Sequence, residues 1–355
     1  MFTSHVFRNR ILIGALAGAA LALGLSLHSP SATAAPRDEV ETLRQAQQQL
    51  CNCFVVIVGK SNADFTSVAS ALDSITNASA DTRYLVWVAP GVYTETGLVQ
   101  VKSYVHLQGS GANVTVIQST RSSGSPTSAA ATVQLDDNAR VSDLTVRNTS
   151  AGPYGIGIYS SNATRSAMIV DSVSEAIGTG GVANYAVFLN DAEPTIERSR
   201  LTASGVTGFG TSVNGALGII NVAGGFPQPL IVSSQLLGGN GSLTSCAGNS
   251  GTGFAIQAVN ASPMIRDSLL CGDRRGIFLG TAGNAQIINS QVAVSNVTGS
   301  FLFETTNGAT VQVATSSVWY ASNKHTGTGG LSCVHAYRSG FTPASDGTTP
   351  ATACN

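Results

Sequence analysis

Short apolar strands broken by Gly, Asn, Asp and Ser recur through the middle of the chain. Six segments share one layout: a small residue or proline, any residue, an Ile or Val, and then polar residues that end in a small one. They begin at Ala167, Pro194, Pro229, Pro263, Ala285 and Ala309, and a weaker copy begins at Ala139. Successive starts lie 22 to 35 residues apart, which indicates a coil of fixed minimum length with insertable loops.

A second short apolar strand precedes most copies of the repeat. Examples are residues 133–135, 156–158, 187–189, 256–258, 277–279 and 301–303. Helical spacing is absent here, so each coil is expected to hold two or three short strands, and such coils stack about 4.8 Å apart into a solenoid. We therefore predict an all-β parallel solenoid over residues 55–323. A sandwich or a propeller is the alternative, although the strands are short and unevenly spaced for either.

Helical spacing appears at the start of the solenoid. Its apolar positions are Phe65, Val68, Leu72 and Ile75. Asp64 is the expected N-cap of this short helix, which would cover the unpaired strand edges of the first coil. Residues 35–54 are predicted to form a polar helical lead-in. Residues 324–355 lose the repeat and are predicted to form a C-terminal cap.

The first 34 residues have the layout of a secretory signal peptide. Arg8 and Arg10 precede the uncharged run 11–27, and the small-residue site Ala32-Thr33-Ala34 follows. The apolar run is at the lower limit for spanning a bilayer, so an uncleaved anchor is the alternative. Because no second long apolar stretch follows, we expect a secreted protein, extracellular or periplasmic, that is not held in a membrane after cleavage.

Composition changes the picture mainly by what is scarce. Only 10% of residues are charged, and 18 Lys and Arg nearly balance 19 Asp and Glu. A nucleic-acid partner is not expected, because a surface that follows phosphates needs clustered Lys and Arg. Stacked coils explain the scarcity, since like charges placed directly above one another destabilise a sheet. Neutral Ser, Thr and Asn avoid that penalty.

The six cysteines all follow the predicted cleavage site. An even number of cysteines in an oxidising compartment favours disulfides, but six allow 15 pairings. Cys246 is expected to pair with Cys271, and Cys333 with Cys354, because each pair closes a local loop. Cys51 and Cys53 are left over, and a bridge between them would be strained. A zinc site is the alternative, but the histidines after the signal do not lie at ligand spacing, so no metal or other cofactor is expected.

Short motifs between residues 55 and 119 are the most specific indication of fold. They are Asp64-Phe65-Thr66-Ser67-Val68, Ala71-Leu72-Asp73, the run from Tyr84 to Glu95, the run from Tyr104 to Gly111, and Thr115-Val116-Ile117. This stretch resembles the opening of pectinesterases and related proteins of the pectin lyase-like superfamily. The resemblance implies a capping helix and the first turns of a right-handed parallel β-helix. We therefore predict that fold, with a disulfide-tied C-terminal cap.

The catalytic motifs of the resembled families are missing. Pectinesterases use two Asp, an Arg and glutamine donors, carried by a Gln-Asp-Thr-Leu, an Asp-x-x-Phe-Gly and a Gly-Arg-Pro-Trp segment. None of these occurs here, and neither do the Asn-Thr-Asp, Gly-Asp-Asp and Gly-His-Gly segments of polygalacturonases. The resemblance therefore implies a scaffold, and any chemistry has to be sought in this chain's own residues.

A polar position four residues past each repeat start is the first candidate site. Asp143, Asp171 and Arg198 would stack about 4.8 Å apart on neighbouring coils. Two carboxylates beside an Arg can split their pKa values and act as acid and base. Turn chemistry is the alternative, because Asn and Asp tolerate the left-handed backbone of a bend. The same position continues along the chain with Ser233, Asp267, Asn289 and Val313.

Three further groups are candidates for substrate binding. Asp136 and Asp191 lie three residues before a repeat start, although solvated loop acids are common. Arg274 and Arg275 suit a carboxylate or uronate, or else a bend paired to Asp267 or Asp273. Tyr159 is one of several aromatic residues expected to be exposed and able to stack on sugar rings. The others are Trp87, Tyr93, Tyr154 and Trp319.

Scaffold without a recognisable catalytic set favours a non-catalytic function. We expect a secreted protein that presents a rigid face to a polysaccharide or cell-wall glycan. One alternative is a divergent pectinesterase-like or lyase-like enzyme that uses Asp143, Asp171 and Arg198. Another is a structural adhesin stalk, which predicts no groove.

Overall fold

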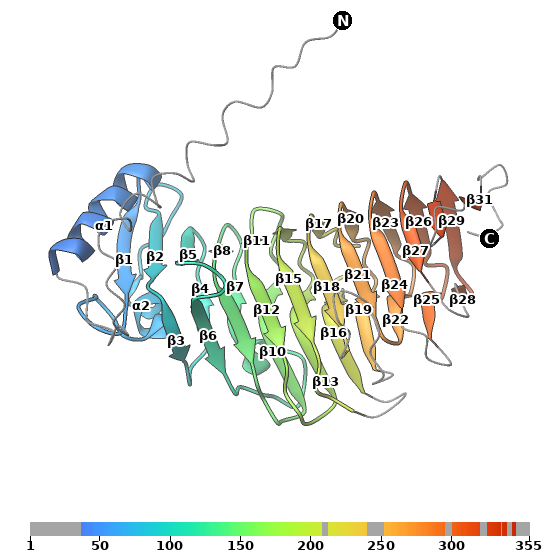
Figure 1. Ribbon diagram of the computed structural model, residues 1–355, viewed down its shortest axis with the longest axis horizontal. Helices are drawn as coiled ribbons and strands as arrows, with labels where there is room; N and C mark the ends of the chain where they lie inside the picture. The colour runs from blue at the N-terminus through green and yellow to red at the C-terminus, as the bar shows by residue number, and fades with distance from the viewer. Residues whose placement is uncertain are drawn as a thin grey trace, which may run out of the picture. The chain divides into compact units, whose positions relative to one another are not determined.

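Three β-sheets run side by side, and successive strands of the chain pass from one sheet to the next (Figure 1). The computed structural model describes residues 37–207, 212–239, 252–294, 300–319, 325–334, 336–338 and 343–345. Neighbouring strands are parallel throughout, except that β31 pairs antiparallel with β30. The fold is a right-handed parallel β-helix, which confirms the predicted fold class.

Each sheet collects every third strand of the coil, with few exceptions. Sheet A consists of β1 (Phe54–Val58), β2 (Tyr84–Val88), β5 (Val105–Gly109), β8 (Arg140–Ser142), β11 (Met168–Val170), β14 (Thr195–Glu197), β17 (Leu230–Val232), β20 (Met264–Arg266), β23 (Asn284–Ile288), β26 (Thr310–Ala314) and β29 (Gly330–Val334). Sheet B consists of β3 (Gly91–Thr94), β6 (Thr115–Ser119), β9 (Thr145–Asn148), β12 (Val173–Ala176), β15 (Arg200–Ala203), β18 (Gln235–Gly238), β21 (Leu269–Gly272), β24 (Gln291–Val294), β27 (Ser317–Trp319), β30 (Ala336–Arg338) and β31 (Pro343–Ser345). Sheet C consists of β4 (Val99–Val101), β7 (Ala131–Leu135), β10 (Tyr154–Ser161), β13 (Ala183–Asn190), β16 (Val213–Ile220), β19 (Gly253–Val259), β22 (Arg275–Gly280), β25 (Phe301–Thr305) and β28 (His325–Gly327).

The apolar position of the repeat forms the core. Ile169 pairs with Val141 on one side and with Ile196 on the other, so the same position stacks in register from coil to coil. All members of the row are fully buried, as alternation along a strand with one buried face requires. The row in sheet A is Val141, Ile169, Ile196, Ile231, Ile265, Ile287 and Val313.

The last member of that row corrects the predicted register. Val313 pairs with Ile287 and is buried, so it does not occupy the polar position of the coil. Thr315 stands there instead, since the Asn289 N–H donates to the carbonyl just before it, on Ala314. The displacement is two residues, which returns every side chain to the same face of the strand.

Two helices precede or follow the first strand. The polar helix α1 (Arg37–Cys51) lies before β1, and the short helix α2 (Val68–Ser74) follows it. The predicted N-cap is wrong: Ser67 caps α2 by accepting from the Ser70 N–H. Asp64 is engaged elsewhere, because its carboxylate accepts from the Ile57 N–H and from the Arg44 guanidinium of α1. Of the helices in the described part of the chain, none is long and apolar enough to span a membrane.

The parallel coil continues past the boundary expected at residue 323. β28, β29 and β30 each pair parallel with the preceding strand of their sheet. Cys53, Cys271 and Cys333 are disulfide-bonded. Cys246 and Cys354 lie outside the described residues, so the predicted pairs Cys246–Cys271 and Cys333–Cys354 stay predictions. The predicted signal peptide also lies outside the described residues.

Candidate functional site

A single residue turns the chain from sheet A into sheet B in most coils. This residue has a left-handed backbone, with φ between 46° and 57° in every case. Turn chemistry therefore accounts for the Asn and Asp found here, whereas Arg198 and Thr315 adopt the same conformation without that preference. We call this row of residues the A–B corner. Its members are Asp143, Asp171, Arg198, Ser233, Asp267, Asn289 and Thr315.

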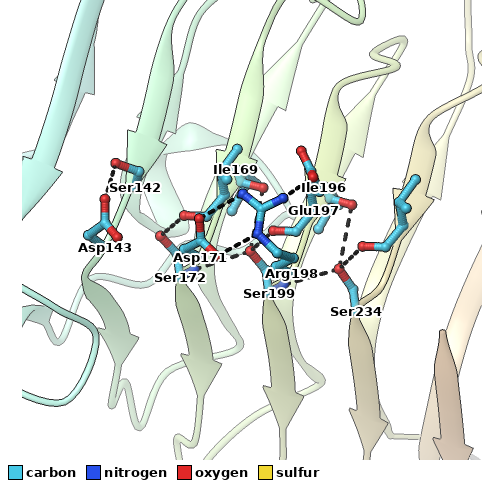
Figure 2. A network of polar contacts seen from close by, with 12 residues as sticks. Ser142, Asp143, Ile169, Asp171, Ser172, Ile196, Glu197, Arg198, Ser199 and Ser234 are labelled. Atoms are coloured by element: carbon cyan, nitrogen blue, oxygen red, sulfur yellow. Dashed lines mark hydrogen bonds and ion pairs between the residues drawn. The ribbon is translucent and has the colours of Figure 1, made fainter. Parts of the chain in front are cut away.

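Asp171 and Arg198 form a two-point ion pair at this corner. Arg198 Nε lies 2.7 Å from Asp171 Oδ1, and the second guanidinium nitrogen, Nη2, lies 2.8 Å from Oδ2. Arg198 also contacts Glu197 (Figure 2). These bonds, together with the charge of Arg198, hold the pKa of Asp171 below its usual range. The carboxylate therefore stays ionised and has both oxygens occupied.

Asp143 is on the preceding coil but has different partners. Its Oδ2 accepts from the Ser142 hydroxyl at 2.8 Å (Figure 2). The same oxygen accepts from Gln108 Nε2 at 3.2 Å. His106 Nε2 lies 2.8 Å from the same Ser142 hydroxyl. Because that hydroxyl has one proton and donates it to Asp143, it accepts from His106, which must carry its proton on Nε2.

The order of these three side chains differs from that of a catalytic triad. In a triad the serine donates to the histidine, which in turn donates to the carboxylate. Here the carboxylate of Asp143 contacts the serine, and Ser142 is only 1% exposed. Burial and then the nearby charge of Arg140 lower the pKa of His106 to about 3. The imidazole is therefore neutral at ordinary pH and positions Ser142.

A row of buried serines lies directly under the corner. The N–H of every serine except the last, Ser316, donates to the hydroxyl of the serine on the next coil, at 3.1–3.2 Å. Each hydroxyl donates in turn to the carbonyl two residues before it. The serine ladder therefore satisfies the backbone at the bend and holds adjacent coils in register. Its members are Ser172, Ser199, Ser234, Ser268, Ser290 and Ser316.

An open groove of about 640 Å³ follows the corner over its last four coils. Apart from one leucine and one aspartate, its lining consists of hydroxyl and amide side chains. The Asp267 carboxylate accepts a hydrogen bond from the Asn289 amide. The lining residues, which define the corner groove, are Ser233, Ser234, Gln235, Asp267, Ser268, Leu269, Asn289, Ser290, Gln291, Thr315, Ser316 and Ser317.

The predicted acids Asp136 and Asp191 lie away from the A–B corner and are engaged separately. Asp136 accepts from Gln100 and Gln134, both at 2.8 Å. Asp191 accepts from the backbone N–H groups of residues 222 and 223 and so holds a loop. Within the described residues, no cluster of three or more His, Cys, Asp or Glu is placed to hold a metal ion.

The paired arginines contact sheet C. Arg275 is buried, pairs with Glu304 and lies over the ring of Phe301. Arg274 lies over Phe254, with its guanidinium carbon 5.6 Å from the ring centre. Burial lowers the pKa of Arg274. The pair therefore packs against aromatic rings of sheet C, and Arg275 forms its ion pair with Glu304.

Tyr159 is not the exposed sugar platform that was expected. Its side chain is 6% exposed, and its ring is stacked on Phe188 with centroids 6.3 Å apart. Tyr185 joins the same cluster, and so does Ala130, which lies outside sheet C at the end of the short 3₁₀ helix η1 (Ser128–Ala130). The alternation of residues along a strand predicts which face of the sheet a side chain occupies. It does not predict whether another segment of the chain covers that face.

His106 and Arg140 are functional candidates that the sequence pattern does not predict. They pair across β5 and β8 and face outward from sheet A. Their separation of 34 positions gives no local signal. Only the register between these two coils brings them together.

Comparison with known proteins supports the resemblance found in the sequence. Residues 54–164 match the family model described as Pectinesterase. Over this stretch the chain is similar to pectinesterases. The matched residues include the whole stretch 55–119 and continue through β10. No curated protein matches the chain.

Several solved structures are similar at low identity. Pectin methylesterase from carrot is 16% identical, with a TM-score of 0.43 over 82% of this chain and 85% of that chain. Pectin methylesterase from Aspergillus niger in deglycosylated form is 14% identical, with a TM-score of 0.40 over 91% and 94%. ORF18 of Geobacillus virus E2 is 13% identical, with a TM-score of 0.43 over 88% and 66%.

Proposed function

We propose that the protein is a secreted polysaccharide-binding protein that holds a glycan chain in the corner groove without cleaving it. The observation that carries the proposal is the groove itself, which crosses four coils and repeats one polar pattern on each. A coil spacing of about 4.8 Å offers a ligand the same contacts at regular steps, which suits a polymer of similar units. A structural stalk would not need such a groove.

The chemistry of the lining suits a glycan. Hydroxyl and amide groups such as those of Gln235, Gln291 and Thr315 both donate and accept, as sugar hydroxyls do. Leu269 adds an apolar contact within the polar lining. The parallel sheets fix the backbone of the lining residues before binding, which reduces the entropy lost in the complex.

The alternative, a pectinesterase-like or lyase-like enzyme, would use the charged part of the same corner. Asp171 has both oxygens on Arg198 and a lowered pKa, which favours neither a general acid nor a free nucleophile. Asp143 accepts from two side chains, and its neighbour Ser142 is buried. This geometry supports binding more than catalysis.

Retention on immobilised polysaccharides tests the proposal. The purified protein is passed over pectin, alginate and peptidoglycan, and we expect saturable retention on at least one of them. The double variant Gln235→Ala/Gln291→Ala should weaken retention at least about fivefold, because each lost hydrogen bond contributes about 0.5–1.5 kcal/mol.

A matched control separates the groove from general surface effects. Gln286→Ala/Gln312→Ala removes two glutamines from the outer face of sheet A, outside the groove, and should leave retention unchanged. Absence of retention on all three polysaccharides would count against the proposal. Release of methanol or of unsaturated uronides from pectin would replace it with the enzyme alternative.

A further inference from the structure

A second pocket, separate from the corner groove, lies at the N-terminal end of sheet A. Its volume is about 340 Å³, within the range of small-molecule sites. It combines two arginines with tyrosine, histidine, amide and hydroxyl side chains, and no carboxylate is among its lining residues. We call it the Arg140 pocket. It is lined by Cys53, Arg83, Tyr84, Leu85, Tyr104, Val105, His106, Asn138, Arg140 and Ser166.

Arg140 has a hydrogen-bonding group without a partner. Its Nε is buried, and within the described residues it has no hydrogen bond and the side chain forms no ion pair. The nearby acid Asp171 is already held at two points by Arg198. A buried N–H left in this state is unfavourable, because it has lost its hydrogen bond to water and gained no acceptor in the protein.

The other acids near the pocket are also occupied. The Asp137 carboxylate accepts from Thr164, Ser166 and Asn138. Asp143 accepts from the side chains of Gln108 and Ser142. The imidazole of His106, which lines the pocket, is neutral and adds no charge. Arg140 and Arg83 are therefore the charged side chains among the pocket's lining residues, and each nearby carboxylate already has hydrogen-bond donors of its own.

Tyr104 supplies an independent sign of a binding role. Its backbone is left-handed, with φ of 64°, which is unusual for a bulky residue. The equivalent residue on the next coil is Asn138, a type that tolerates this conformation, and the Tyr104 N–H donates to its carbonyl. Strain of this kind persists at functional sites, where the side chain it presents is needed. Here the ring forms part of the pocket wall.

We propose that the Arg140 pocket binds the carboxylate of a sugar acid. Arg140 would engage the carboxylate, since a guanidinium matches its planar geometry. The ring of Tyr104 would contact the sugar face, and Asn138 and Ser166 would contact hydroxyl groups. This proposal does not depend on the corner groove, so either can fail without the other.

Calorimetric titration with matched small ligands tests the pocket. Glucuronate and glucose differ only in the carboxylate, and inorganic phosphate is an anion without a sugar ring. We expect saturable binding of glucuronate, at least about tenfold weaker binding of phosphate, and none of glucose. Equal affinity for glucuronate and glucose, tighter binding of phosphate, or no saturable binding would each overturn the proposal.

Variants locate the binding. Arg140→Gln should lower the affinity for glucuronate at least about tenfold. Arg266→Gln, on the same outer face but outside the pocket, should leave it unchanged. Tyr104→Asn should weaken binding while the midpoint of thermal unfolding holds or rises, because Asn relieves the backbone strain. Unchanged affinity in both pocket variants would place the ligand elsewhere and overturn the proposal.

Discussion

The Arg198 guanidinium donates a hydrogen bond to each carboxylate oxygen of Asp171 on the neighbouring coil, at 2.7 and 2.8 Å. The pair is exposed to solvent, with the side chains 48% and 40% accessible, so water screens it strongly. We expect a double-mutant cycle of Asp171→Asn and Arg198→Met to give a coupling of about 0.2–1 kcal/mol in urea unfolding. A coupling above about 2 kcal/mol would show that the pair is less screened than its exposure implies.

The same pair has a defined pH dependence. Arg198 lowers the pKa of Asp171 in the folded protein, so the stabilisation is present above the unfolded pKa of an Asp and is lost as the pH falls through the lower folded value. Arg198→Met should raise the pKa of Asp171, as measured by NMR titration of its carboxyl carbon. No upward change in Arg198→Met would contradict the assignment.

His106 should make the protein sensitive to acid. Burial and Arg140 lower its pKa from 6.5 to about 3, so the unfolded chain binds a proton that the folded chain does not between these values. Stability should therefore rise with pH from about 3 to 6.5, by an amount on the order of a few kcal/mol. His106→Gln keeps a donor for Ser142 but does not titrate. Its free energy of unfolding should depend less on pH across this window, and parallel profiles for the two proteins would refute the role of His106.

The serine ladder should respond sharply to loss of one hydroxyl. Ser234→Ala removes the acceptor of the buried Ser199 N–H, which we expect to lower the free energy of unfolding by about 1–3 kcal/mol. Ser317→Ala, in the following strand position of a later coil and only half-buried, is the matched control and should change stability little. Equal effects of the two substitutions in denaturant unfolding would rule out the ladder as the cause.

Tyr185 lies across two glycines of the next strand. A Cβ at Gly218 would come within 2.7 Å of both Tyr185 and Phe188, so Gly218→Ala should destabilise by about 1–3 kcal/mol. Tyr185→Phe, which loses the 2.6 Å bond to Gln257, should cost about 1 kcal/mol. Gly97→Ala meets no neighbouring atom and is the control. Thermal unfolding that ranks the three otherwise would contradict this packing.

The fold was predictable because its signal is repeated. An Ile or Val at one position of every coil predicts the buried row that contains Ile169 and Ile196, and each copy reinforces the others. Register was less secure. The last repeat fits equally well when shifted by two residues, since this shift preserves the alternation of faces, and so Val313 was assigned a position that Thr315 occupies.

The candidate site was predictable only where its residues share a repeat position. Asp171 and Arg198 occupy equivalent positions on successive coils, and the structure brings them together as expected. The contact between His106 and Ser142 joins different positions of two coils, and depends on the register of β5 with β8. Exposure of Tyr159 depends on another segment of the chain that covers it, which no pattern within its own strand records.

The serine ladder also makes each coil depend on the coil that follows it in the chain. Each serine N–H is satisfied by a hydroxyl that arrives one coil later, so a bend made early stays incomplete until the next turn of chain has been laid down. During synthesis from the N-terminus, the newest coil is therefore always the least complete, and every added coil closes the bend of the one before it. A chain cut short after any coil would leave the serine N–H of its last bend without a hydroxyl acceptor, in addition to the open edges of the three sheets, while all earlier bends remain closed.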